Sequence, residues 1–166
     1  MTLHSMLVSL QELPFSAAIR GDTPGTEWLF PIVETCHVLA LTVVFGSIAM
    51  VDLRLLGVVS RGTPVARLTG EVLPWTWSAW ILAAITGSTL FVSKAVTYAD
   101  NFDFRMKFLF MALAAVNMLV FHFGAYRRVA EWDVGVPPPA ARAAGGLSML
   151  FWLAVIFFGR WIGFTT

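Results

Sequence analysis

The sequence predicts an all-α integral membrane protein: an up-down-up-down four-helix bundle that spans the bilayer, preceded by an amphipathic helix at the membrane surface. Two observations lead to this prediction. Apolar residues make up 58% of the 166-residue chain and charged residues only 13%, which is more apolar and less charged than a soluble domain. Four stretches free of Asp, Glu, Lys and Arg also approach the ~20 residues that a helix needs to cross a bilayer.

The same composition excludes several other classes of protein. The chain has a single cysteine and cannot form an intramolecular disulfide, which excludes the small disulfide-stabilised folds. Its apolar content excludes intrinsic disorder. The net charge of +1 gives no electrostatic reason to expect a nucleic-acid partner. The partner that the composition does imply is the lipid bilayer.

Local signals bound the four helices. Pro74 is expected to open the second helix and Asn101 or Asp103 to cap the third, whereas the proline run 136–139 cannot be helical and forms a stiff linker. The first helix is ended by Gly57, Gly62 and Pro64. The predicted spans are therefore 28–56, 74–95, 104–126 and 145–164, and their short connections make consecutive helices antiparallel neighbours.

The first 27 residues have a different pattern. Apolar residues recur at helical spacing from Leu3 to Ala17, and polar residues fill the opposite face. This is typical of an amphipathic helix that lies along the membrane surface; the alternative is that it covers the mouth of the bundle. The chain therefore divides into an N-terminal amphipathic segment, 1–27, and a four-helix transmembrane domain, 28–166.

The basic residues predict the orientation. The connections after the first and third helices carry six arginines, against five basic residues on the other side. Three of those five, Lys94, Lys107 and Arg160, lie within helix ends rather than in loops. Because loops rich in Lys and Arg stay in the cytoplasm, we expect both termini to be periplasmic. In the absence of an organellar signal, this predicts a multi-pass protein of the bacterial inner membrane.

Ionisable groups inside the spans are the candidates for chemistry, because they are costly in lipid. Glu34 and His37 are spaced i, i+3 and share a helix face. One interpretation is a proton-handling pair, or a metal ligand, His37, beside a carboxylate that accepts a proton. The other is structural, with Glu34 in an ion pair with Arg160, Lys107 or Lys94.

The two intramembrane histidines suggest a b-type haem. However, His37 lies outward of the centre of the first span and His122 inward of the centre of the third. The offset is about 11 residues, or roughly 16 Å along the helices. The two histidines are therefore not expected to bind the same iron. Single-histidine sites remain: Met111 or Lys107 lies at the depth of His37, and Met50 or Met149 at the depth of His122.

The sequence also resembles two groups of membrane proteins. The Glu-x-x-His segment 34–37, the Asp-Leu-Arg-Leu-Leu-Gly segment 52–57 and Thr86-Gly87 resemble a family of uncharacterised bacterial four-helix membrane proteins, over residues 15 to 165. More distantly, the first-helix histidine, followed by a glycine and an Arg-Leu pair, is similar to the membrane protoporphyrinogen oxidase HemJ and the copper-resistance D membrane domain. HemJ-type proteins bind haem, which implies His37 as a ligand and Lys107 as a functional residue.

Three classes of function therefore compete. The first is a small haem-binding redox or electron-transfer protein, with haem b at His37 or, separately, at His122, and with Glu34 and Lys107 as catalytic residues. The second is a non-catalytic accessory or scaffold subunit that binds a membrane partner or a second copy of itself. The third is a proton-coupled small transporter built around Glu34. Whether the protein is an enzyme is left open.

Overall fold

The computed structural model describes residues 2–165, and the elements in this range are all helical. Four helices are long and apolar enough to cross a membrane, which confirms the all-α class and a multi-pass membrane protein. They are α3 (Leu29–Leu55), α4 (Val65–Ser93), α6 (Phe102–Phe123) and α8 (Pro139–Thr165). Shorter helices connect or precede them: α1 (Leu3–Gln11), α2 (Pro14–Arg20), α5 (Ala95–Asp100), the 3-10 turn η1 (Ala125–Arg128) and α7 (Val129–Trp132). The outer limits of the two predicted segments, residues 1 and 166, lie outside this range.

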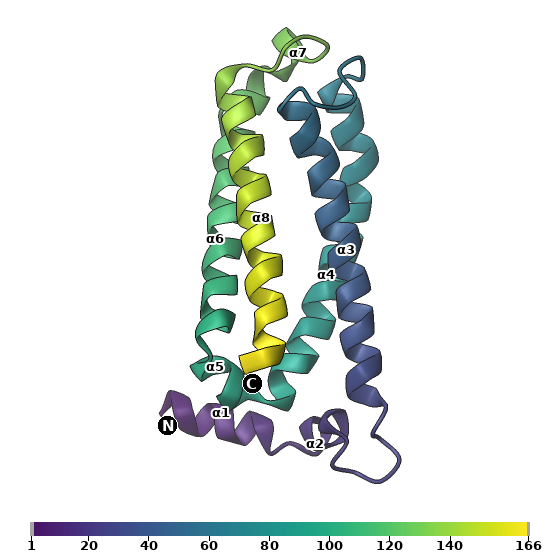
Figure 1. Cartoon of the computed structure of the whole chain (residues 1–166), viewed down its shortest axis with the longest axis vertical. Helices are drawn as coiled ribbons and strands as arrows, with labels where there is room; N and C mark the ends of the chain where they lie inside the picture. The colour runs from purple at the N-terminus through teal and green to yellow at the C-terminus, as the bar shows by residue number, and fades with distance from the viewer. Residues whose placement is uncertain (1, 166) are drawn as a thin grey trace.

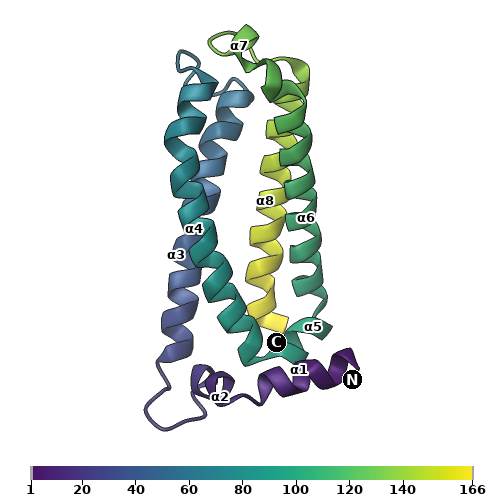
Figure 2. The ribbon, with the colours of Figure 1, turned by 180° about the vertical axis from the view of Figure 1, so that it is seen from behind.

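The long helices form two antiparallel pairs (Figure 1, Figure 2). α3 packs along α4 and α6 along α8, and the pairs meet mainly through α3 and α8. Both helices of the first pair bury small residues, among them Ala40 and Ser47 on α3 and Ala79 and Ala83 on α4. Small residues let helix backbones approach closely, which is how helices associate in lipid.

Polar side chains and one glycine bring the helices into close contact. The Thr76 hydroxyl of α4 donates to Ser47 of α3 at 2.8 Å, and the Asn117 amide of α6 donates to the Ala144 carbonyl of α8 at 2.9 Å. A Cβ placed on Gly145 of α8 would lie 3.0 Å from the Asp52 carbonyl oxygen of α3. A larger residue at 145 would therefore push the two helix pairs apart.

The second long helix starts earlier than the sequence predicts. α4 begins at Val65, and Pro74 lies inside it, so the prediction that Pro74 opens this helix is wrong. The reason lies far away in the chain. The Val65 N–H donates to the Asp133 carbonyl at 3.2 Å, and the Ala66 N–H donates to the Asp133 carboxylate at 2.8 Å. Asp133 thus satisfies N–H groups that a helix start leaves without partners.

Other boundaries also differ from the predicted spans. α8 begins at Pro139 rather than at 145, because proline at the first helical position needs no hydrogen-bond donor. α6 ends at Phe123 rather than at 126, and the chain tightens there into the turn η1. The predicted cap is confirmed: the Phe104 N–H donates to the Asn101 side chain at 2.9 Å.

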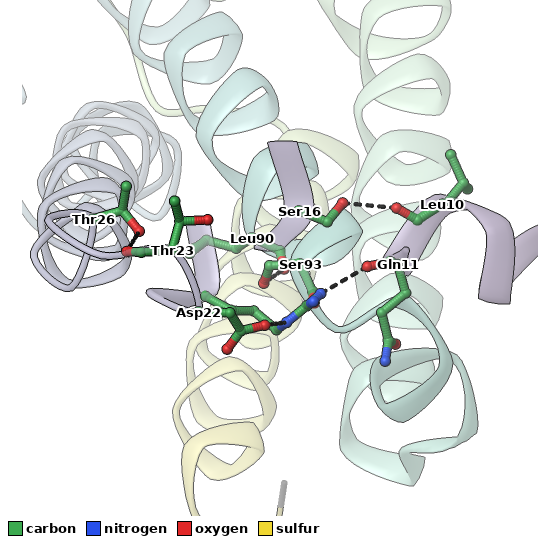
Figure 3. A network of polar contacts seen from close by, with 9 residues as sticks. Leu10, Gln11, Ser16, Asp22, Thr23, Thr26, Leu90 and Ser93 are labelled. Atoms are coloured by element: carbon green, nitrogen blue, oxygen red, sulfur yellow. Dashed lines mark hydrogen bonds and ion pairs between the residues drawn. The ribbon is translucent and has the colours of Figure 1, made fainter. Parts of the chain in front are cut away.

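The N-terminal segment is two helices rather than one. Leu13 adopts an extended conformation and Pro14 then opens α2, since proline favours a first helical position. In Figure 1 both helices run across the ends of the four long ones. Figure 3 shows the polar contacts of this segment, in which the Ser16 hydroxyl of α2 donates to the Leu10 carbonyl of α1 at 2.7 Å.

Arg20 links this segment to the bundle. One guanidinium nitrogen, Nη1, donates to the Gln11 carbonyl at 2.8 Å and to the Ser93 carbonyl at 2.7 Å. Nε pairs with Asp22 at 2.8 Å. These carbonyls belong to the last turns of α1 and α4, where carbonyl groups find no N–H donor within their own helix. A cation is also favourable at a helix C-terminus. Arg20 therefore holds the C-terminal ends of α1 and α4 together.

The arrangement leads to a topology prediction. Reporter domains inserted after Gly62 and fused after the last residue should lie on opposite sides of the membrane, because α4, α6 and α8 separate them. A third reporter at Asp100, between α4 and α6, should match the C-terminal one. Alkaline phosphatase and fluorescent-protein activities measure the side directly. If the reporters after Gly62 and the C-terminus fall on the same side, one of the three helices does not span.

Candidate functional site

A cavity of about 390 Å³ lies between the two helix pairs. It is lined by residues from the first half of α3 and α6 and the second half of α4, with Trp152 and Val155 from α8. This places it nearer the chain termini than the arginine-rich connections. The side chains that reach it include three of the predicted site residues, namely His37, Lys107 and Met111.

His37 is oriented by Thr86. The imidazole Nδ1 lies 3.0 Å from the Thr86 hydroxyl oxygen. That hydroxyl donates its single proton to the Leu82 carbonyl at 2.7 Å, one turn back in α4, so towards His37 it acts as an acceptor. In the neutral imidazole the proton is therefore on Nδ1 and the lone pair on Nε2. A ligating histidine uses this arrangement, in which the second ring nitrogen donates to a fixed acceptor.

Gly87 provides the space for the imidazole. A Cβ built on Gly87 would lie 2.9 Å from His37 Cε1, closer than real Cβ atoms approach, and 3.4 Å from Nδ1. The ring therefore packs directly against the backbone of α4. Thr86 and Gly87 together define both the position and the tautomer of His37.

The opposite wall of the cavity comes from α6. Lys107 and Met111 are four residues apart and both line the cavity, so they share one face of this helix. Lys107 extends along α8, because a Cβ on Gly159 would lie 3.6 to 3.8 Å from its Cδ, Cε and Nζ atoms. No ion pair or hydrogen bond of the Lys107 ammonium occurs in the part of the chain described.

Apart from Ser88, the rest of the wall is apolar and largely aromatic. It contains Trp80, Phe91, Phe104, Phe108 and Trp152, and none of the lining residues is acidic. α4 and α6 both line the cavity yet hardly touch each other, and they lie toward the viewer in Figure 2. A ligand could therefore enter sideways, between these helices.

Glu34 does not join the site. It is exposed and absent from the cavity wall, and the ion pair expected with Arg160, Lys107 or Lys94 does not form among residues 2–165. Each basic group has another environment: Arg160 stacks on Phe164 at 4.8 Å and Lys94 lies 6.0 Å above Phe30. The carboxylate instead lies near Tyr98 of α5. Burial, and then the charge of Glu34, raise the pKa of that phenol.

His122 lies outside the cavity. It is exposed near the end of α6, where its ring stacks on Tyr126 at 5.4 Å between centroids. Lys107 and Met111, on the same helix, lie 15 and 11 residues earlier, which corresponds to roughly 22 and 16 Å at ~1.5 Å per residue. The structure therefore brings His37, Lys107 and Met111 together and leaves His122 and Glu34 apart from them.

Some residues of the site were not predicted as its members. Thr86 is recognisable in the sequence as a polar group inside a span, and Gly87 as a packing residue, but neither pattern indicates that they hold His37. The aromatic wall has no signal of its own, since aromatic residues are common in membrane spans. Only the pairing of α3 with α4 brings these residues together.

The chain belongs to a family of unknown function, DUF6644, whose model matches residues 19–165. This agrees with the resemblance to an uncharacterised family, and it brings no activity with it. No curated protein and no solved structure matches the chain significantly.

Proposed function

We propose that this member of the DUF6644 family is a small membrane haem protein of b type, with His37 as an axial ligand. The observation that carries the proposal is the orientation of His37. Its Nδ1 faces the Thr86 hydroxyl, whose proton is used by α4, so Nε2 is left as a lone-pair donor on the edge of an apolar cavity. Haem bound there would supply one-electron redox chemistry.

The other residues of the cavity fit the same group. The Met111 thioether across the cavity is a soft ligand of the kind that completes His/Met haem sites. Lys107 in its protonated form has no lone pair to donate, and it would instead hold the negatively charged edge of the cofactor. Aromatic side chains supply the flat apolar surface that a porphyrin requires. The volume of about 390 Å³ lies within the range of ligand pockets, and the site is open between α4 and α6.

A bare metal ion fits less well than haem. Within residues 2–165 no group of three or more His, Cys, Asp or Glu side chains is placed to hold a metal. A protein metal site usually needs three or four such ligands. His37 could therefore hold a metal only where most of the ligands come with the cofactor, as in haem.

The proposal includes the orientation of the protein in the membrane. The arginine-bearing end of the bundle faces the cytoplasm of a bacterial inner membrane, and both termini lie in the periplasm. α1 and α2 then rest at the outer surface of the membrane, where their exposed apolar residues, such as Leu3, Met6 and Leu10, enter the interface. The cavity opens nearer this outer surface.

The test is the absorbance spectrum of the full chain, purified from cells supplied with haem. We expect a Soret band at about one haem per chain, which shifts and sharpens on reduction with dithionite. A protein that stays colourless under these conditions overturns the proposal. The accessory-subunit function would then be the better one, and co-purification of a second membrane chain would support it. Proton-coupled transport would require that vesicles containing the protein take up a small solute, and that this uptake depends on Glu34.

A further inference from the structure

A second pocket lies at the opposite end of the bundle from the His37 cavity. It has a volume of about 460 Å³ and lies between the end of α3 with the connection that follows it, residues 134–137, and the start of α8. Three arginines line it, Arg54, Arg61 and Arg142, and none of its lining residues is acidic. Three guanidinium groups around one pocket would repel each other unless an anion lies between them.

Arg54 is fixed in place, and within residues 2–165 its charge has no carboxylate partner. Its side chain is 1% exposed. Nε donates to the Thr63 carbonyl at 2.9 Å, and Nη2 donates to the Asp133 carbonyl at 3.1 Å. Over the described part of the chain, Nη1 donates to no protein atom and no ion pair is formed. A buried charge is normally paired, so Arg54 presents unused donors beside the pocket.

The other two arginines can complete a site around Arg54. Arg61 donates from Nε to the Gly57 carbonyl, and its two terminal nitrogens have no hydrogen-bond partner among the residues that the structure describes. The Arg142 side chain makes no hydrogen bond or ion pair within residues 2–165. Asp133, whose main chain binds Arg54, directs its carboxylate to the Ala66 N–H at 2.8 Å and does not line the pocket.

We propose that Arg54, Arg61 and Arg142 form a binding site for a phosphate group at this end of the bundle. The planar guanidinium fork matches phosphate oxygens in pairs. Arg54 supplies a rigid, buried donor, whereas Arg61 and Arg142 are exposed and close over the bound anion from either side. The phosphate can belong to the headgroup of an anionic phospholipid or to a soluble ligand. This site is independent of the haem proposal, since it shares no residue with the cavity of His37.

The experiment uses the full chain in nanodiscs, and thermal unfolding is followed by tryptophan fluorescence. One arm compares phosphatidylcholine discs with discs that also contain phosphatidylglycerol. The other adds inorganic phosphate to phosphatidylcholine discs, with sodium chloride at the same ionic strength as reference. A rise in unfolding temperature with phosphatidylglycerol alone identifies a lipid headgroup. A saturable rise with inorganic phosphate identifies a soluble phosphate ligand. Either rise supports the site.

Two double variants decide whether the pocket is responsible. R61Q/R142Q removes the two exposed arginines of the pocket, and R127Q/R128Q removes two exposed arginines of the same end that do not line it. We expect the first to weaken phosphate or headgroup binding about tenfold or more, since hydrogen bonds to charged groups contribute at least about one tenfold step. The second should change it less than about twofold. Equal losses in both, or no rise in either arm for the wild type, overturn the proposal.

Discussion

Replacing His37 by alanine is expected to abolish haem retention, whereas replacing His122 by alanine leaves it intact. His37 alone of the two lines the cavity and has its Nδ1 fixed by Thr86. His122 is exposed near the end of α6 and stacks on Tyr126. The measurement is the Soret absorbance per chain of each purified variant, before and after reduction. For H37A we expect a decrease of at least about tenfold, because loss of even a supporting residue costs that much.

A second variant, G87A, keeps the His37 imidazole but displaces it. G87A places a Cβ 2.9 Å from His37 Cε1, so it should reduce haem retention although every ligand is present. G70A is the matched control, because it lies on the same helix and its Cβ would meet no atom within 4 Å. G70A should bind haem as the wild type does. Equal loss of haem in H37A and H122A would contradict the single-histidine site, and unchanged binding in G87A would contradict the role given to Thr86 and Gly87.

Replacing Arg54 by leucine is expected to destabilise the fold strongly. The side chain is 1% exposed and joins the Thr63 carbonyl to the Asp133 carbonyl. Leucine leaves both acceptors without this donor at the place where the two helix pairs are connected. A buried acceptor that loses its donor typically costs about 1–3 kcal/mol, so for the two carbonyls we expect a loss of roughly 2–6 kcal/mol. Unfolding in mixed micelles, titrated with a denaturing detergent, measures it.

Two variants test the reason for that loss. R54K keeps the charge but replaces the fork by a single nitrogen, so it should be destabilised less than R54L. R67A removes an exposed arginine at the start of α4, which pairs with Glu71 at 2.8 Å. It should have little effect, because exposed ion pairs contribute little to stability. If R54L unfolds like the wild type, the Arg54 bonds are not what holds this end together.

The candidate site was predicted in part. His37, Lys107 and Met111 were expected to meet, because the first and third spans run in the same direction and the depth of a residue follows from counting residues between helix ends. The same count separated His122 from them. Glu34 was expected in an ion pair that does not form. Its potential partners lie beside aromatic rings or along Gly159 instead. A sequence pattern does not show which side chain of a neighbouring helix a residue will contact.

Sequence alone determined the class of this protein: four helices, each long and apolar enough to span a membrane. Length and hydropathy are properties of a continuous segment, and so is the cap at Asn101, whose partner is three residues away. The start of α4 depends on Asp133, which is 67 residues beyond Ala66. In the same way the orientation of His37 depends on Thr86 and Gly87, and the fixed position of Arg54 depends in part on Asp133, 79 residues further along the chain. Contacts between segments far apart in the chain arise only when the helices pack, so tertiary structure alone decided them.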